Sequence, residues 1–394
     1  MTANPSGRPQ ADKDSPFAQF SLLGGPFHDF ATKAATRVTG GDSLVFFTGL
    51  SVFVWLVLAL LATVEGHADK FFSLGTTAVH GRFLVAIPLI FWCEKLLAQA
   101  TRDACAGLVS TGVVTGEAKA ALDSDATRLE RISDSWWLQF GLLFAVVIFS
   151  FSAASEYLPG ESAAKSNMTS VSLAGKWYWL VCLPLFRFVM ARMFWLLGIW
   201  VYLIWRLSRQ PLALTASHPD RAGGLGLLEV AQAQLVVFVL GIAALDAAAL
   251  AETFQHVAPN EAQIYVHVFL VALVGVLVVC GPLLLLVSPL FRCRRRGMID
   301  FSALANAYSV KFQQRWIGPA KPDLSELLGT GDIQSLADLA TGYENVRTMR
   351  VLPVTNTLLF LILCAAAVPH APLLLMKYPM TDLISGLVQN IIGI

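Results

Sequence analysis

The chain has few charged residues and no excess of positive charge. Asp, Glu, Lys and Arg make up only 14% of its 394 residues, whereas 56% are apolar, and the formal net charge is +1. Soluble domains carry about 25% charged residues, so this composition is typical of a protein embedded in a bilayer. A nucleic acid is excluded as the expected partner, because the basic residues form no stripe over one domain.

The chain also lacks the motifs of the common enzyme and metal-site classes. Its six cysteines show neither zinc-site spacing nor a disulfide framework. Gly-x-Ser-x-Gly, His-Glu-x-x-His and Gly-x-x-x-x-Gly-Lys are absent. Of the histidines, only His267 lies well inside an apolar segment, and no second histidine is expected to face it, which argues against a haem. The sequence predicts no catalytic residue, no metal and no cofactor.

Seven apolar segments are long enough to cross a membrane. A spanning helix needs roughly 20 apolar residues, because the hydrocarbon is about 30 Å thick. The second segment is the weakest, since it is short and contains Glu94 and Lys95. The seven segments are residues 43–64, 83–98, 136–155, 177–205, 230–250, 264–290 and 356–376.

Orientation follows from the distribution of the 28 Lys and Arg residues, because positive residues in short loops stay in the cytoplasm. With a cytoplasmic N-terminus and seven spans, most of them fall inside. A missed span would invert the later loops and destroy this pattern. The expected fold is therefore an all-α integral membrane protein of about seven transmembrane helices. The Lys and Arg residues that do not fall on the cytoplasmic side are Lys70, Arg82, Lys165, Lys176 and Lys377, which fall outside, and Arg187 and Arg192, which lie within the fourth span.

Four regions are expected along the chain. Residues 1–42 form a cytoplasmic N-terminal tail with no cleavable signal peptide. Residues 43–290 carry spans one to six and include a cytoplasmic helical segment at 99–131. Residues 291–354 form a cytoplasmic region of amphipathic helices, because apolar residues recur there at three- and four-residue intervals. Residues 355–394 hold the seventh span and a C-terminal amphipathic helix at 381–394, too short to span and expected at the outer interface.

The cytoplasmic amphipathic pattern has two parts. One face of the first helix repeats from Phe301 through Leu304 to Trp316. One face of the second helix repeats from Ile333 through Ala340 to Tyr343. Each pattern predicts an amphipathic helix.

Two arginines lie deep in the fourth span. At 1.5 Å per residue, Arg187 and Arg192 lie about 15 and 22 Å below its outer end. Such charges normally face the bundle interior or a water-filled cavity. Glu94 is expected level with Arg187, Asp246 nearer the outer surface, and Gln232 within reach of Arg192. Either these side chains line an ion pathway that attracts an anion, or they form a buried ion pair that holds helices in register.

A glycine-rich loop, SHPDRAGGLG at 217–226, follows the fourth span. Glycines before a helix can expose backbone N–H groups to an anion or a carboxylate. The alternative is a tight turn in which the His and Asp side chains cap the backbone. The candidate residues of this loop are His218, Asp220, Arg221, Gly223 and Gly224.

A run of arginines follows the sixth span. Each basic residue near the surface contributes about 1 kcal/mol to binding anionic lipid headgroups. The alternative is a stop-transfer anchor that only fixes the span. The residues are Arg292, Arg294, Arg295 and Arg296.

Three stretches together carry a resemblance. They are SHPDRAGGLGLLE at 217–229, PLLLLVSPLFRCRRRGMIDFSALANAY at 282–308 and GDIQSLADLATGYENVRTMRVLP at 331–353. They resemble a family of uncharacterised bacterial polytopic inner-membrane proteins. The resemblance covers roughly the C-terminal half and implies a multi-pass protein of the bacterial inner membrane. It implies no activity.

Two functions are consistent with these observations. The first is a membrane channel or transporter for a small ion, with an anion as the candidate, assembled as a homo-oligomer. The second is a non-transporting membrane scaffold or sensor that acts through its cytoplasmic helices. The expected partners are the lipid bilayer, further copies of the chain and a small anion.

Overall fold

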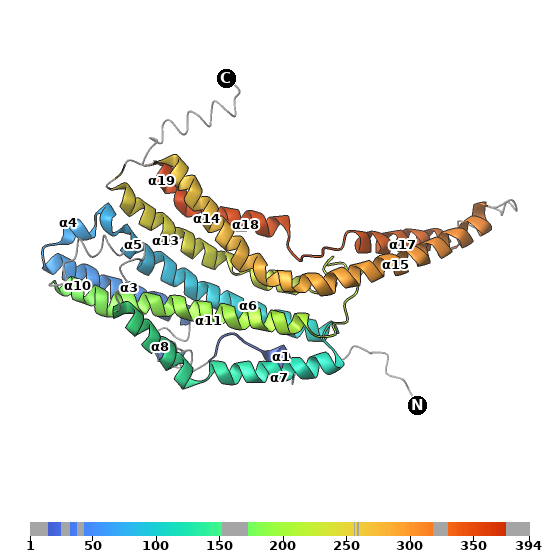
Figure 1. Cartoon of the computed structure of the whole chain (residues 1–394), viewed down its shortest axis with the longest axis horizontal. Coiled ribbons are helices and arrows are strands. Elements are labelled where there is room, and N and C mark those ends of the chain that lie inside the picture. The colour runs from blue at the N-terminus through green and yellow to red at the C-terminus, as the bar shows by residue number, and fades with distance from the viewer. Residues whose placement is uncertain are drawn as a thin grey trace, which may run out of the picture.

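A computed structural model describes residues 15–24, 32–37, 43–151, 172–255, 257, 260–317 and 330–375. Within these ranges the regular elements are helices, and no strand occurs. Six helices are long and apolar enough to cross a bilayer, and a bent helix pair raises the number to as many as seven. The chain is therefore an all-α, multi-pass membrane protein (Figure 1).

The first span is the single helix α3 (Ser43–Val64), whereas the other long helices are stacks of shorter ones. Glycine, proline or a local change of helix type separates the members of each stack. The members are η1 (Leu74–Thr76), α5 (Thr77–His80), η2 (Gly81–Ala86) and α6 (Ile87–Ser110); α10 (Leu173–Trp177), η4 (Tyr178–Cys182) and α11 (Leu183–Ser208); α12 (Gly226–Ala233) and α13 (Val236–Phe254); α14 (Glu261–Cys280), η5 (Gly281–Leu286), α15 (Val287–Phe312) and η6 (Gln313–Ile317); and α18 (Asn356–Ala367), η7 (Val368–His370) and α19 (Ala371–Leu375).

The second and third predicted spans differ most from expectation. The second is a helix of 37 residues from Leu74 to Ser110, longer than the predicted 83–98. The third contains α8 (Trp136–Phe151), which is bent by 53° relative to α7 (Gly116–Ser133). α8 is too short to count as a span alone, and the bent pair of α7 and α8 together has the length and hydropathy of a span. Residues 152–155 of the predicted third span lie outside the described part. Six spans are thus clear, and the seventh is the bent pair.

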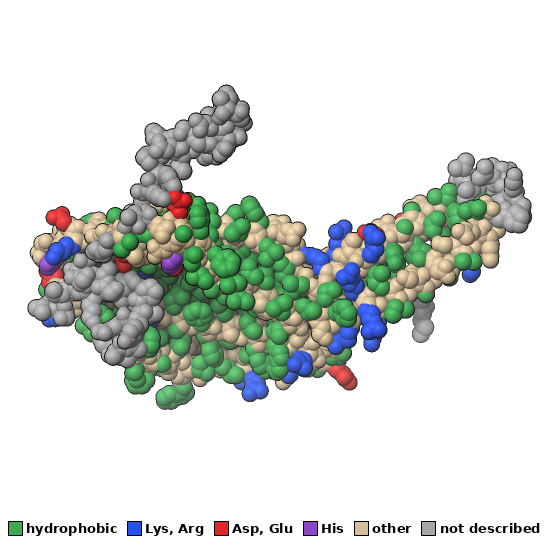
Figure 2. Space-filling view, turned by 45° about the horizontal axis from the view of Figure 1, so that its top comes forward, with side chains coloured by type: hydrophobic (Ala, Val, Ile, Leu, Met, Phe, Trp, Pro, Cys, Tyr) green, Lys and Arg blue, Asp and Glu red, His purple; other side chains and the backbone are tan. Residues whose placement is uncertain are grey.

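Apolar side chains cover the outside of the bundle as well as its interior. α3, α8 and α14 expose Phe53, Phe144 and Phe269, as expected for helices that face lipid. Figure 2 shows apolar side chains over the bundle and Lys and Arg side chains gathered where α15 leaves it. The positive-inside rule predicts that this end faces the cytoplasm.

α15 and α17 (Asp332–Arg347) pair side by side and form an arm that projects from the bundle (Figure 1). At the far end of the arm, the Trp316 indole donates to Asp332 Oδ2 at 2.9 Å. The paired arm confirms the two predicted helices. Along the predicted faces, Phe301, Phe312 and Tyr343 are partly buried and Trp316 is buried, whereas Leu304, Ile333 and Ala340 are exposed.

Part of the predicted N-terminal tail packs against helices at the predicted cytoplasmic end of the bundle. α1 (Pro16–Gln19) packs against α6 and α7 and buries Phe17 and Phe20. The Ser15 hydroxyl and the Phe17 backbone N–H both donate to Asp123 Oδ1, at 2.5 and 2.9 Å. The tail is therefore fixed to α7 at this point. The predicted C-terminal helix at 381–394 lies outside the described residues.

Candidate functional site

A buried ion pair joins α6 and α11 inside the bundle. Arg192 Nη1 lies 3.0 Å from Glu94 Oε2, and the two side chains are only 8% and 4% exposed. Sequence depth placed Glu94 level with Arg187, and the structure corrects this. Because the second span begins at Leu74 and not at residue 83, Glu94 lies deeper and reaches the level of Arg192.

Arg187 is also buried but faces a different helix. Its guanidinium carbon lies 5.1 Å from the centre of the Phe149 ring, which belongs to α8. This distance is within the range of a cation–π interaction. The two arginines of the fourth span thus contact opposite neighbours, Arg192 toward α6 and Arg187 toward α8.

Further buried polar atoms lie between this ion pair and the predicted cytoplasmic end. In the described part of the chain, Thr101 Oγ1, Trp200 Nε1 and both amide atoms of the Gln232 side chain have no hydrogen-bond partner. Glu94 Oε1 is likewise buried and has no hydrogen-bond partner among the described residues. Thr101 and Trp200 lie about 11 and 12 Å beyond the ion pair on α6 and α11, at 1.5 Å per residue, and are therefore level with each other.

The fifth span changes its helix type beside these groups. Between α12 and α13, the amides of Leu235 and Val237 bond to carbonyls three residues back, at 3.0 and 3.2 Å. The Cys93 thiol, adjacent to Glu94 on α6, donates to the Gln234 carbonyl at 3.4 Å. Such tight turns inside a long helix often mark a functional hinge.

Asp246 lies apart from the arginines. Its carboxylate Oδ2 is 3.0 Å from His267 Nδ1 and 3.0 Å from His370 Nε2, so one carboxylate joins α13, α14 and η7. Two sequence expectations were wrong here: Asp246 does not pair with an arginine, and His267 does have a second histidine near it. A depth comparison across the short α13–α14 connection would have placed Asp246 and His267 level.

Two polar contacts near the predicted outer end were not foreseen. Arg82, assigned to an outer loop, is buried and donates to the Tyr178 hydroxyl. These residues belong to the π-helical turns η2 and η4, so the contact joins the second and fourth spans. Glu252 Oε1 accepts the backbone N–H of Ala78 at 2.8 Å and joins the second and fifth spans.

The carboxylate of Asp220 organises the glycine-rich loop. It accepts the backbone N–H groups of Ala222 at 2.8 Å, Gly224 at 3.1 Å and Gly226 at 2.9 Å, and it lies 2.7 Å from His218 Nδ1. Burial alone would raise the pKa of the Asp220 carboxyl, but these donors together lower it below its ordinary value. The N–H groups considered as an anion site therefore already bind this side chain.

The backbone of the same loop is fixed in an unusual conformation. Arg221, Gly223 and Gly224 have positive φ angles of 53°, 67° and 96°. Glycine adopts this region easily, whereas for Arg221 it is uncommon and costs conformational energy. A Cβ atom at Gly224 would also lie 2.7 Å from Val113 Cγ2. These features favour the interpretation of the loop as a tight structural turn.

The loop is joined to the chain before the seventh span. The backbone N–H of Arg350 donates to the Arg221 carbonyl at 2.7 Å, and its guanidinium lies 3.1 Å from Glu229 Oε2. Glu229 Oε1 accepts the backbone N–H of Thr355 at 2.6 Å. The start of the fifth span and the start of the seventh span are therefore held together.

The three stretches that carry the sequence resemblance meet at this point. The contacts just described join 217–229 to 331–353. A Cβ atom on Gly297 would lie 2.3 Å from Ala216 Cβ and 3.2 Å from Val346 Cγ1, so 282–308 packs closely against both sides of the junction. The three stretches thus meet at one junction, at the predicted cytoplasmic end of the bundle, and not at the ion pair of Glu94.

The arginines of the run after the sixth span lie in three different environments. Arg292 and Arg296 line a cavity beside the glycine-rich loop. Arg294 donates to the Arg347 carbonyl at 2.8 Å and so fixes α17 to α15. Arg295 is exposed and does not line the cavity.

Among the described residues, no group of three His, Cys, Asp or Glu side chains is arranged to hold a metal ion. In the described part of the chain, polar side chains gather inside the bundle at the ion pair with its neighbouring polar atoms, at the Asp246 cluster and at the contacts of Arg82 and Glu252. The family suggested by the three stretches stays a prediction. Comparison of the chain with protein-family models, with curated proteins and with solved structures found no match.

Proposed function

We propose that the protein is a transporter or channel of the bacterial inner membrane that passes a small ion along the polar groups between α6, α11 and α12. The observation that carries the proposal is the set of buried polar atoms beside the Arg192–Glu94 pair that have no partner in the described chain. Burying such a group costs about 1–3 kcal/mol. A protein retains several of them where water or an ion can bind.

The buried arginines support an anion as the cargo. Arg187 and Arg192 place two guanidinium groups in the bundle interior, and Glu94 pairs with Arg192. Asp246 lies against two histidines and not against these arginines. Positive charges in a medium of low dielectric constant attract an anion and repel a cation.

Thr101→Val is expected to lower ion flux by about tenfold while leaving the fold intact. The change keeps the side-chain shape and removes a buried hydroxyl with no partner, so it gives no loss of stability. A hydrogen bond to a charged species contributes about 1.5–3 kcal/mol, and about 1.4 kcal/mol corresponds to tenfold in rate. The measurement is chloride and potassium flux through purified protein in liposomes.

Thr253→Val serves as the matched control. Thr253 is exposed on α13 and bonds to its own helix at Ala249 O, 3.2 Å away. Equal flux in parent, Thr101→Val and Thr253→Val would contradict a pathway at Thr101. A chloride flux that falls only in Thr101→Val would support it and identify the cargo class.

The second candidate is a membrane scaffold or sensor that acts through the α15–α17 arm. The observation that favours it is the arm itself, which exposes Ile299, Leu304, Ile317 and Ile333 outside the bundle. These side chains would be covered by a partner or by a second copy of the chain. Folded protein that conducts neither chloride nor potassium would favour this candidate over transport.

A further inference from the structure

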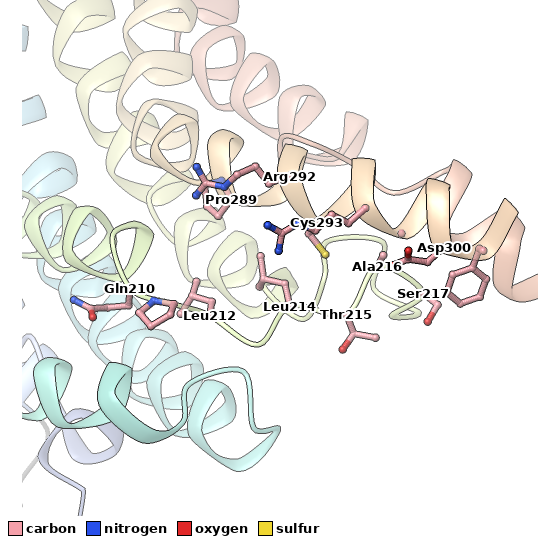
Figure 3. Close-up of a pocket in the computed structure, with 14 residues that line it drawn as sticks. Gln210, Leu212, Leu214, Thr215, Ala216, Ser217, Pro289, Arg292, Cys293 and Asp300 are labelled. Atoms are coloured by element: carbon pink, nitrogen blue, oxygen red, sulfur yellow. The ribbon is translucent and has the colours of Figure 1, made fainter. Parts of the chain in front are cut away.

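A cavity of about 600 Å³ lies between the loop after α11 and one face of α15 (Figure 3). This volume is within the range of ligand-binding pockets. Residues 210–217 form one wall, and residues of α15 from Pro289 to Phe301 form the other. The polar residues of the lining are Gln210, Thr215, Ser217, Arg292, Arg296 and Asp300.

The positions of the arginines give the cavity its charge. Arg292 and Arg296 are four residues apart, which places them on the same face of α15. Arg292 Nη1 also donates to Ser288 Oγ at 3.1 Å, within its own helix. Asp300 balances one of the two positive charges, so the lining is left with one net positive charge. Arginine is the side chain best suited to bind phosphate through paired N–H donors.

The cavity lies at the boundary between apolar and basic surface. Toward the bundle, the sixth span exposes Leu284 and Phe291. Toward the arm, the arginine run begins at once with Arg292. On the far side, the contact of Gly297 with Ala216 brings the loop directly against α15. A ligand with a phosphate group beside an apolar part matches this arrangement.

We propose that this cavity binds the phosphate of an anionic ligand through Arg292 and Arg296. Two sources share this chemistry: the phosphodiester of an anionic phospholipid and a soluble phosphate. The exposed apolar residues beside the cavity fit the lipid, since they can contact its acyl chains. The site is separate from the proposed ion pathway, and its test does not depend on transport.

The first experiment compares lipid binding of purified full-length variants in nanodiscs or by native mass spectrometry. Arg292→Gln/Arg296→Gln is expected to bind phosphatidylglycerol about 30-fold more weakly, because it removes the charge-assisted hydrogen bonds of both guanidinium groups to the phosphate. Arg295→Gln is the matched control, because it removes the same charge from the same helix outside the cavity. The proposal would be overturned if Arg295→Gln lowered the affinity for phosphatidylglycerol as much, per charge removed, as the double variant does. That result would show general attraction between charges and no specific site.

The second experiment needs no change in the cavity. Of the six cysteines, four are buried, and only Cys293 and Cys364 are partly accessible. In a Cys364→Ser protein, maleimide labelling of Cys293 in the cavity wall reports occupancy. Slower labelling in phosphatidylglycerol than in phosphatidylcholine supports a lipid, and slower labelling with inorganic phosphate in phosphatidylcholine supports a soluble ligand. Equal labelling in all three conditions would overturn the proposal.

Discussion

Glu94→Leu is expected to destabilise the protein by about 3–5 kcal/mol. The substitution leaves the Arg192 guanidinium buried without its carboxylate, 3.0 Å away in the parent, and an uncompensated buried charge costs about this amount. The free energy of unfolding, measured by denaturation in mixed detergent micelles, tests this expectation. A loss below about 1 kcal/mol would show that Arg192 finds another partner or water.

The double variant Glu94→Leu/Arg192→Met separates the effect of the ion pair on stability from its effect on flux. Replacing both members of a buried ion pair by apolar residues is often neutral or stabilising, so most of the lost stability should return. Flux should remain low, because the charged groups of the proposed pathway are gone. If the double variant conducts like the parent, the pair only holds α6 and α11 in register.

Asp220→Asn is expected to lower the free energy of unfolding by about 2 kcal/mol. The asparagine has one acceptor oxygen where the carboxylate has two, and the parent side chain accepts N–H groups with both. Hydrogen bonds to a charged acceptor contribute about 1.5–3 kcal/mol each, and the 22% exposure of Asp220 reduces that value. Asp338→Asn on the exposed face of α17 is the control and should have little effect.

The same carboxyl gives a prediction for pH. The folded pKa of Asp220 is below the ordinary value of 3.8, so the folded state holds this proton less tightly than the unfolded state. The stabilisation is therefore present above the ordinary pKa and is lost as pH falls through the folded value. The stability difference between parent and Asp220→Asn should therefore begin to shrink as the pH falls below about 4 and should continue to shrink at lower pH. A constant difference would contradict the assigned role.

Hydropathy and charge distribution were sufficient to predict a helical membrane protein and most of its spans. They failed at the ends of the second span because Arg82 and Glu94 lower the hydropathy of that segment. Both residues are buried and bonded to partners on α11 or η4. A sum over single residues cannot include the stabilisation that a partner on another helix provides.

The candidate site was predictable only in part for the same reason. Depth along each helix named Arg187, Arg192, Glu94 and Asp246 as buried charges, and the structure buries the first three. Which of them pair depends on the neighbours of each helix and on its rotation about its own axis. Neither is encoded in hydropathy, and Asp246 was therefore assigned to the arginines and not to the histidines.

The sixth span and the arm are parts of one helix of 57 residues from Glu261 to Ile317. About 40 Å of it extends beyond Leu290, at 1.5 Å per residue, so a tilt of about 5° within the bundle moves the tip by about 3.5 Å. α17 then returns from the tip to Arg350 and the start of the seventh span. The arm therefore acts as a lever: its far end is connected through α17 to the start of the seventh span. A tilt of the sixth span would pull on the seventh.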